Sequence, residues 1–510
     1  MPDLIVTIKL LHLAAFTITF RMNTTFKTIL AVATMAAIFA CSGKEGPEKK
    51  PVPGQISITN VRIDGVYATA DVESSTITAT FPTRTDFSSC EMTIESQTVT
   101  LDLSTPATYR VIRDNIYQDY SVIARNTGLP VVRIQTPGEK NIAVGENGNR
   151  DYYKDNWMEG ATMRIELPDG TVDYEGQMGI RGRGNSTWNY PKKPYALKLD
   201  SKAEILGMPK HKRWILLANW KDRTILRNDA AFWLSRTIGL PYTVRGQFVE
   251  LVMNGTHAGN YYLCEQIKID KNRVNIDKDG GFLLEVDSYY DEPNKFRYTQ
   301  LLNLPWMVKE PDGGELNLDY YKELQDFIFN LETLMKSESR VRNHEYADYL
   351  DVQTAIDFLI MQELTGNHDF YNTWPSAGPH SLYMYKPAGG KLYSGPAWDF
   401  DFHVFLPERA NFWCGATQTM FYPYLLKDPD FKAALVARWN EKKDELKKLP
   451  EYIDSMADSI RLSESFNSTL WPISNRENGD EEMTFQQSVE RIKKAFLDKW
   501  EWIDNNISRL

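Results

Sequence analysis

Apolar and polar residues alternate in short runs between residues 55 and 128. Such runs occupy residues 56–61, 68–72, 76–81 and 99–103. Turn residues interrupt them every ~8–12 positions, a spacing typical of a small β-sandwich. A period of two places one face of each strand toward a core. We therefore expect an all-β module over residues 55–128, acting as a spacer or interaction module.

The pattern changes at about residue 129, where strands and helices mix. We expect strands at residues 131–134, 162–167, 174–183, 195–199 and 281–287, and a hairpin over residues 248–264 whose turn is Asn254-Gly255. Amphipathic helices are expected at residues 224–239, 317–337 and 346–364, and residues 424–510 are mainly helical. Asp222 or Thr224 would cap the first of these helices, and Gly239 would close it. The fold class predicted for the chain is α+β.

The N-terminus has the pattern of an export signal. Lys27 precedes an apolar run from Ile29 to Phe39, and the small residue Ala40 stands before Cys41. This resembles a bacterial lipoprotein signal in which Cys41 is lipidated and Met22 is the true start. The alternative is a transmembrane anchor, but the run is shorter than the ~20 apolar residues that a span needs. We expect an exported lipoprotein at the outer membrane or cell surface, with residues 42–54 as a linker.

Charge and cysteine content exclude several classes of protein. The net charge of −10 over 510 residues argues against nucleic acid as a partner. Besides Cys41, only Cys90, Cys264 and Cys414 are present, too far apart for a zinc site or a disulfide framework. We expect these three thiols to be ordinary buried residues.

The segment from Asn367 to Asp401 carries the densest candidate chemistry. Asp399 and Asp401 stand at i and i+2 among aromatic residues, so on a strand both would point to the same face. Two adjacent carboxylates repel unless a cation lies between them. An upstream Asp and Asn, returned by a hairpin, would complete an oxygen site for Mg²⁺ or Mn²⁺. Turns and helix caps also use Asp, which leaves a purely structural interpretation open.

The order of parts from residue 174 onward is the order found in protein kinases. A glycine-containing turn over residues 179–187 would cover phosphates, although it matches neither GxGxxG nor GxxxxGK[ST], and a simple β-turn remains an alternative. Lys198 follows on a strand that reads Tyr-Ala-Leu-Lys, where it would reach an α- or β-phosphate. Surface lysines on strands are common, so Lys198 alone does not distinguish a phosphate-binding lysine from an ordinary surface one.

Several motifs together resemble the spore coat protein H (CotH) kinase family. They are Gly182-Arg-Gly-Asn-Ser186, Lys192-Lys-Pro-Tyr-Ala-Leu-Lys198, Leu226-Arg-Asn228, Ile238-Gly-Leu-Pro241, Asn254-Gly255 with Gly259–Ile267, Gly281–Asp287, Asn367-His-Asp369 and Trp398-Asp-Phe-Asp401. The resemblance spans roughly residues 129–440, since boundaries read from sequence are soft.

The resemblance implies an atypical protein kinase that transfers the γ-phosphate of ATP to Ser or Thr hydroxyls of a protein. It implies that Asp369 orients the hydroxyl and accepts its proton. Metal ligands would be Asp399 with Asp401 or Asn372, holding Mg²⁺ or Mn²⁺. Residues implied at the nucleotide are Lys198, Arg181, Arg183 and Glu265, the last of which would orient Lys198 or ATP.

Three features depart from the kinase pattern. Asn372 follows Asp369 more closely than in His-Arg-Asp-x-x-x-x-Asn, which makes it the weakest of the three candidate metal ligands. The helix at 224–239 offers only Asp229, and no glutamate, to pair with Lys198. An exported kinase would also meet little ATP outside the cytoplasm.

The sequence therefore predicts four parts: residues 1–41 as an over-extended start with a signal peptide, 42–54 as a linker, 55–128 as an Ig-like sandwich, and 129–510 as a kinase-like domain. Two other functions stay open. One is an inactive surface binding or adhesion protein that reuses the fold. The other is a glycoside hydrolase that pairs Asp399 or Asp401 with Glu363 or Asp369.

Overall fold

The computed structural model describes residues 50–83, 86–146, 149–287, 295–298, 301–302, 304–311, 318–370, 379–472 and 478–510. The chain divides into two compact units, Met1–Ile56 with Arg110–Gln118, and Ser57–Tyr109 with Asp119–Leu510. Cys41 and the rest of the predicted signal lie outside the described residues, so the lipid anchor stays a prediction. Every helix within the described ranges is too short or too polar to cross a membrane.

The smaller unit contains one short parallel pairing. β1 (Val52–Pro53) pairs with the start of β9 (Ile116–Asn126), placing Val52 opposite Ile116. The Ile56 N–H donates to the Gln118 side chain at 2.6 Å. These bonds join the first described residues to a strand far along the chain.

The β-rich segment of the larger unit contains two sheets. In one sheet, β5 (Thr76–Phe81) pairs in parallel with β9 and in antiparallel with β4 (Thr69–Asp71). The other sheet has the order β3-β2-β6-β7: Val66–Tyr67, Arg62–Ile63, Cys90–Ile94 and Gln97–Leu101. β8 (Ala107–Arg113) pairs with β9. The strand-rich character expected for this segment is present, while its Ig-like classification and its boundaries stay predictions.

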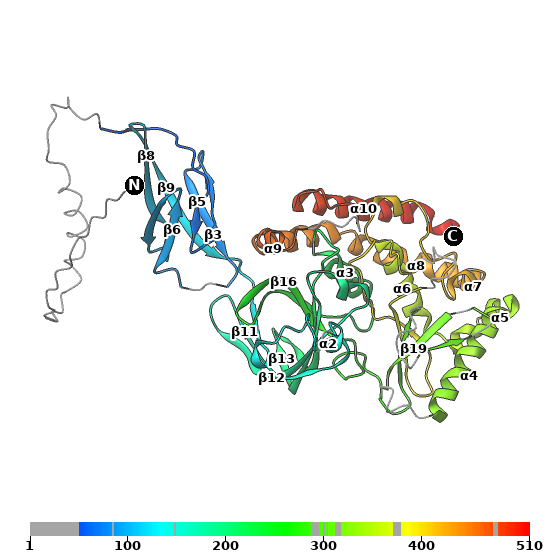
Figure 1. The fold of residues 1–510 in the computed structure, drawn as a ribbon. Coiled ribbons are helices and arrows are strands. Elements are labelled where there is room, and N and C mark those ends of the chain that lie inside the picture. The colour runs from blue at the N-terminus through cyan, green and yellow to red at the C-terminus, as the bar shows by residue number, and fades with distance from the viewer. Residues whose placement is uncertain are drawn as a thin grey trace, which may run out of the picture. The chain divides into compact units, whose positions relative to one another are not determined.

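A closed barrel follows, in the order β10-β11-β12-β13-β14-β16-β15. Its strands are Val131–Gln135, Met158–Glu166, Val172–Gly182, Tyr195–Ile205, Met208–Leu217, Thr256–Glu265 and Gly246–Met253, in that same order. Figure 1 shows them in cyan and green. Alternate side chains such as Ile180, Leu197 and Trp214 fill the interior. The alternation seen in the sequence is therefore the inside and outside of a barrel.

The hairpin between β15 and β16 confirms a turn predicted from two residues. Asn254 and Gly255 have φ angles of 50° and 76°. Both lie in the left-handed region, as a two-residue primed turn requires. The Asn254 side chain also accepts the Thr136 N–H at 2.8 Å, which ties the turn to the end of β10.

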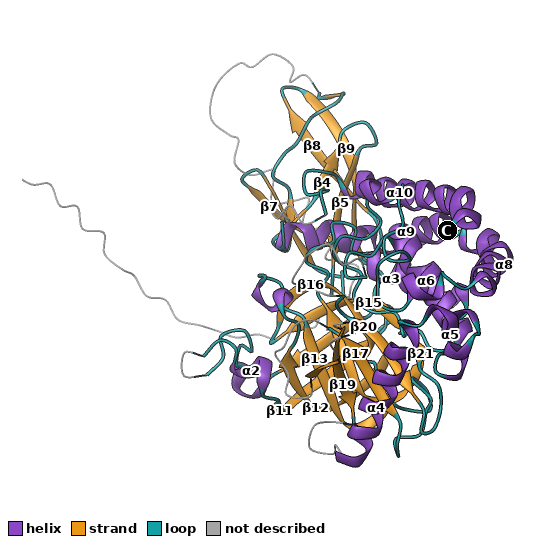
Figure 2. Cartoon of the chain, turned by 90° about the vertical axis from the view of Figure 1, so that its right-hand side faces the viewer, coloured by secondary structure: helices purple, strands orange, loops and turns teal. Residues whose placement is uncertain are grey.

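A second sheet has the order β18-β19-β17-β20-β21. Its strands are Lys295–Tyr298, Leu304–Glu310, Phe282–Val286, Leu382–Lys386 and Tyr393–Ser394. Helix α4 (Leu318–Met335) contacts it through β18 (Figure 2). β17 lies at the centre of this sheet, and Asp287, directly after its end, donates its N–H to the Pro305 carbonyl at 3.1 Å.

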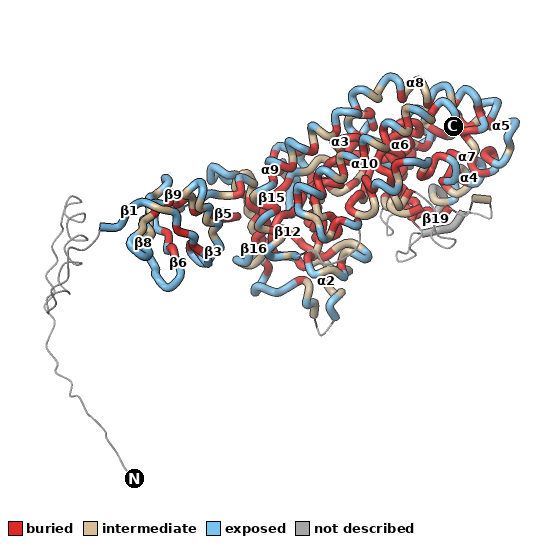
Figure 3. The backbone as a smooth tube through the Cα atoms, turned by 90° about the horizontal axis from the view of Figure 1, so that it is seen from above, coloured by how far each residue is buried: buried red, intermediate tan, exposed pale blue. Residues whose placement is uncertain are grey.

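Helices α3 (Arg227–Ile238), α8 (Pro429–Leu446) and α10 (Phe485–Asn506) pack against α6 (Val352–Thr365), which is buried from Thr354 to Thr365 (Figure 3). Besides α4 and α6, the α-helices within the described residues are α2 (Tyr152–Asp155), α3 (Arg227–Ile238), α5 (Glu338–Arg342), α7 (Tyr422–Leu425), α8 (Pro429–Leu446), α9 (Leu449–Leu470) and α10 (Phe485–Asn506). α3 contacts α6, α8 and α9, and α9 contacts β16. One apolar core therefore joins the helices, the second sheet and the outer face of the barrel at Ile215 and Leu217.

Two helix starts differ from the sequence prediction. α3 begins at Arg227 rather than at residue 224, because Asp222 reaches forward and accepts the Arg227 N–H at 2.8 Å. α6 begins at Val352 rather than at residue 346, with Asp351 accepting the Thr354 N–H at 2.8 Å. In α6 this bond is a side-chain N-cap, whereas the N-cap of α3 is Leu226, and Asp222, one of the two caps expected from the sequence, bonds to the first helical N–H from five residues upstream.

Candidate active site

A cavity of about 550 Å³ collects most of the charged residues that the sequence singled out. Its carboxylates are Glu285, Asp287, Asp369, Asp399 and Asp401. Its basic side chains are Arg183, Lys221, Lys309, His368 and His380. The glycine-containing turn, the second sheet and the Asp-Phe-Asp segment all contribute to its walls. A cavity with both charges suits a ligand that carries phosphates together with a cation.

Asp399 and Asp401 line this cavity from a loop and not from a strand. Both lie in loop, and Asp399 has a φ of 68° in the left-handed region. Asp tolerates this conformation better than most residues. The Ser381 hydroxyl donates to Asp399 at 3.0 Å, and Phe400 between the two acids is fully buried. The condition of a strand is not met, but both carboxylates line one cavity.

Asp369 is placed by the end of α6. Gly366 closes the helix with a φ of 60°. The Asn367 side chain then accepts the Asp369 N–H at 3.0 Å and donates to Gln362 at 2.8 Å. The Asp369 carbonyl accepts the His380 N–H at 3.0 Å. Main-chain bonds on both sides therefore fix Asp369 without using its carboxylate.

The three aspartates repel one another. Burial and the Asp399 carboxylate raise the pKa of Asp369. Burial and Asp399 likewise raise the pKa of Asp401. Lys221 opposes both shifts, since its positive charge favours the ionised carboxylates. A divalent cation between the acids would relieve the repulsion further, and carboxylate oxygens are the ligands that Mg²⁺ and Mn²⁺ prefer. The donor set therefore fits such an ion.

The glycine-containing turn forms one wall of the cavity. Residues 183–187 contribute to the lining. A Cβ atom on Gly182 would lie 2.3 Å from the Trp188 ring, and one on Gly184, whose φ is 87°, would lie 2.0 Å from Thr187 Oγ1. The Arg183 guanidinium lies 5.3 Å from the centre of the Trp398 ring. Glycine at both positions allows the close packing that brings Arg183 next to the acidic segment.

Helix α3 forms hydrogen bonds to the acidic segment, the loop that carries Asp399 and Asp401. The Asn228 side chain accepts the Phe400 N–H at 2.8 Å, and Arg227 Nε donates to the Val404 carbonyl at 3.2 Å. Arg227 is fully buried and pairs with Asp222 and with Asp480, the latter at 2.7 Å. The motif Leu226-Arg-Asn228 thus acquires a role that the sequence did not assign. It holds the loop that carries Asp399 and Asp401.

Lys198 and Arg181 do not line the cavity. Leu197 and Leu199 fill the barrel core, so Lys198 points to the outer face, where its Nζ lies 3.4 Å from Glu159. The cationic groups of Arg181 and Lys198 lie 4.9 and 5.8 Å from the centre of the Trp157 ring. The alternation of the strand was predicted correctly. The neighbour of Arg181 and Lys198 on this face is Trp157, however, and not the aspartates of the cavity. Of the three cations proposed for the nucleotide, only Arg183 lines the cavity.

Glu265 and Asn372 do not support their expected roles. The buried Glu265 carboxylate accepts bonds from Arg245 at 2.8 Å and from the Tyr242 hydroxyl at 3.0 Å, and Arg273 Nε lies 3.7 Å from it. The expectation that Glu265 orients Lys198 therefore finds no support. Asn372 lies outside the described residues.

The Glu363 carboxylate stabilises the loop at residues 414–416 through hydrogen bonds. It is 1% exposed and accepts the N–H groups of Cys414 and Gly415, each at 2.7 Å, and of Ala416 at 2.8 Å. A carboxylate used in this way is not available as a catalytic acid. The pairing of Glu363 with Asp399 or Asp401 in a glycosidase is therefore wrong.

Sequence reasoning missed Lys221, which lines the cavity and is only 8% exposed. Its Nζ lies 3.8 Å from the centre of the Phe402 ring and 5.3 Å from that of Tyr190. The only signal in the sequence is its place shortly before the Leu226-Arg-Asn228 motif. All three described cysteines are buried and free of disulfides, as expected.

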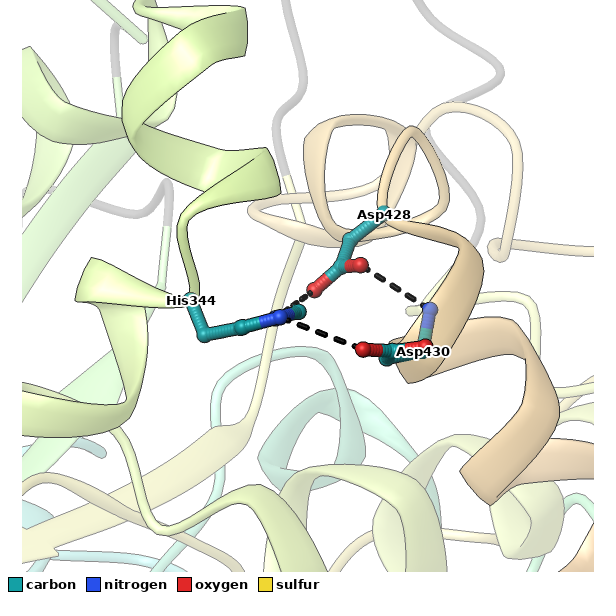
Figure 4. A group of neighbouring side chains, drawn as sticks. All are labelled: His344, Asp428 and Asp430. Carbon is teal, nitrogen blue, oxygen red and sulfur yellow. Dashed lines mark hydrogen bonds and ion pairs between the residues drawn. The ribbon is translucent and has the colours of Figure 1, made fainter.

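A second group of potential metal ligands lies elsewhere and comprises His344, Asp428 and Asp430 (Figure 4). Asp428 caps α8, accepting the Asp430 N–H at 2.9 Å and the Tyr346 hydroxyl at 2.5 Å. His344 places Nδ1 2.6 Å from Asp428 and Nε2 3.2 Å from Asp430. Because the two carboxylates engage different ring nitrogens, we interpret the group as a hydrogen-bonded helix cap and assign it no ion.

Comparisons with known proteins agree with the kinase-like order of parts. The model of the family described as "CotH kinase protein" matches residues 180–503. This match begins and ends later along the chain than the motifs suggested, and it includes the C-terminal helices. A crystal structure of the Golgi casein kinase is similar at 10% identity, covering 68% of this chain and 71% of that chain, with a TM-score of 0.20, too low to support an argument. No curated protein matches.

Proposed function

Because the chain belongs to the CotH kinase protein family, we propose that it transfers the γ-phosphate of ATP to Ser or Thr hydroxyls of a protein substrate. We further propose that it does so as an exported lipoprotein anchored through Cys41. Membership of the family supports a kinase-like function in general. The nucleotide, the metal, the substrate and the location are the finer parts of the proposal.

The convergence of Asp369, Asp399 and Asp401 on one cavity carries the proposal. Asp399 and Asp401 would hold Mg²⁺ or Mn²⁺, which when bound neutralises charge on the phosphates and on the acids. Arg183 and the residues of its turn would lie along the phosphates. Lys309, which pairs with Glu285 at 3.0 Å, adds positive charge on the side of the second sheet. Positioning and charge neutralisation are what phosphoryl transfer asks of a protein.

In the proposed reaction, Asp369 accepts a hydrogen bond from the Ser or Thr hydroxyl of the substrate and takes its proton as the oxygen attacks. A bond forms between that oxygen and the γ-phosphorus, while the bond from the γ-phosphorus to the bridging β-oxygen breaks. ADP leaves with the electron pair of that bond. The main-chain bonds that hold Asp369 leave its carboxylate free for this role.

The proposal is tested by incubating the purified protein with Mg²⁺, ATP labelled on the γ-phosphate, and exported proteins as candidate substrates. We expect label on Ser or Thr residues, located by mass spectrometry, and none when the divalent cation is chelated. Absence of transfer, together with an unchanged Tm on adding Mg·ATP, would contradict it. That result would favour the adhesion alternative.

Gly184→Ala provides a prediction about the turn. An added Cβ would meet Thr187 Oγ1 at 2.0 Å, so the cavity wall must shift. We expect kcat/KM for ATP to fall by about 10-fold or more, since small displacements of substrate-positioning groups are costly. Steady-state kinetics at varied ATP concentration measure the change.

Gly170→Ala is the matched control for Gly184→Ala. Its φ of 84° is close to the 87° of Gly184, but nothing lies within 4 Å of the added Cβ. Both variants therefore carry similar backbone strain, and only one disturbs the cavity. Equal kinetic losses in the two variants would argue against a role for the turn.

A further inference from the structure

Lys221 occupies a place in the cavity that the proposed reaction has not yet used. It is 8% exposed, and the 3.8 Å distance from its Nζ to the Phe402 ring puts its charge beside the Asp-Phe-Asp segment. Its positive charge acts on both Asp369 and Asp401. Two other non-histidine cations line the same cavity: Lys309, which pairs with Glu285, and Arg183, whose guanidinium lies 5.3 Å from the centre of the Trp398 ring.

One carboxamide from the C-terminal part of the chain joins Lys221 to Asp401. Asn478 Nδ2 donates to the Lys221 carbonyl at 2.7 Å and to the Asp401 carbonyl at 3.0 Å. Asn478 Oδ1 accepts the His403 N–H at 2.7 Å. Asn478 is 3% exposed, and its own carbonyl accepts a bond from Arg491 on α10 at 2.7 Å. The positions of Lys221 and Asp401 are therefore set by the same buried side chain.

This arrangement meets a requirement of phosphoryl transfer. The phosphoryl group carries negative charge on its oxygens while the acids around it are also negative, so a fixed cation beside them is needed in addition to a metal. A lysine ammonium is a compact charge with three donors, suited to phosphate oxygens. Its Nζ already lies near the Phe402 and Tyr190 rings, and the side chain is buried, so little side-chain freedom remains to be lost on binding.

We propose that Lys221 is a catalytic residue that donates to the γ-phosphoryl oxygens during transfer, and that Asn478 positions it relative to Asp401. The assignment rests on the proposed function. The hydroxyl oxygen bonds to the γ-phosphorus, the bond to the β-bridging oxygen breaks, and the proton of the hydroxyl goes to Asp369, so the step takes no proton from Lys221.

Lys221→Met is expected to lower kcat by about 10²–10³-fold, the effect of removing one donor from a developing anion. Lys221→Arg should recover part of the rate because it keeps the charge. Lys386→Met is the matched control, since Lys386 is also buried, at 4% exposure, and lies 4.8 Å from the centre of the Phe327 ring, but does not line the cavity. Its kcat should stay within about 3-fold of wild type.

Binding of Mn²⁺ without nucleotide gives a second readout. Removing a positive charge beside the acids should tighten Mn²⁺ binding to Lys221→Met several-fold, whereas loss of folding would weaken it. Calorimetric titration with Mn²⁺ measures this. Full kcat in Lys221→Met, or a larger loss in Lys198→Met, would overturn the assignment while leaving the kinase proposal intact. If the wild-type protein neither transfers phosphate nor binds Mg·ATP, the proposed function is wrong, and the assignment of Lys221, which rests on it, is wrong as well.

Asn478→Ala tests the positioning role. It should lower kcat by about 10-fold or more with a smaller change in the KM for ATP, because Lys221 and Asp401 lose their common anchor. Asn467→Ala is the control: Asn467 is 8% exposed and accepts the Asn260 N–H at 3.1 Å, away from the acidic segment. A similar fall in Tm with kcat unchanged is expected for it. Equal kcat losses in both variants, or none in Asn478→Ala, would overturn the positioning role.

Discussion

Asp369→Asn is expected to lower kcat for protein phosphorylation by about 10²–10⁴-fold, the usual range for loss of a general base. Asn can still accept a hydrogen bond from the substrate hydroxyl, but it cannot take the proton. The variant should fold normally, since the bonds from Asn367 and His380 that hold residue 369 involve only its main chain. Steady-state rates with saturating Mg·ATP, together with Tm, measure both effects.

A half-buried aspartate outside the cavity provides the control for this variant. Asp504 accepts bonds from Trp439 and Lys443, each at 2.8 Å, and does not line the cavity. Asp504→Asn should leave kcat within about 3-fold of wild type. If Asp369→Asn behaved in the same way, Asp369 would not be the base.

Arg227→Met is expected to have the largest effect on stability. Arg227 is fully buried between Asp222 and Asp480, so the substitution leaves two carboxylates in the core without their partner. Breaking a buried ion pair in this way costs about 3–5 kcal/mol. The free energy of unfolding measured in urea should fall by that amount, because both Asp222 and Asp480 lose the ion pair with Arg227.

An exposed arginine gives the comparison. Arg342 pairs with Glu338 at 3.0 Å, and the side chains are 54% and 52% exposed. Arg342→Met should change the free energy of unfolding by no more than about 1 kcal/mol, since solvent screens such pairs. If the two arginine variants were equally stable, Arg227 would not be an anchor of the core.

Local patterns in the sequence predicted much of the fold around the site. The alternation of β12 and β13, the Asn254-Gly255 turn and the stop of α3 at Gly239 depend on neighbouring residues only, and the structure has all three. The family to which the chain belongs was also predicted from short motifs. The domain boundaries and the catalytic roles of the site residues stay predictions.

The partners that complete the cavity depend on contacts between distant segments. Lys221 and Asn478 are separated by 257 residues, and no periodicity or motif connects them. The face of Lys198 was predictable from strand alternation, but the presence of Trp157 on that face was not. Asp399 and Asp401 share a cavity although they lie in a loop, because Asn228 and Asn478 hold that loop.

A crystal structure with Mn²⁺ and a nonhydrolysable ATP analogue measures the central claim most directly, because the anomalous signal of Mn²⁺ locates the metal. The account predicts an anomalous peak between Asp399 and Asp401, with the γ-phosphate between that ion and Lys221, and Asp369 facing the γ-phosphorus. A nucleotide bound outside this cavity, or a metal peak only at His344 and Asp428, would contradict it.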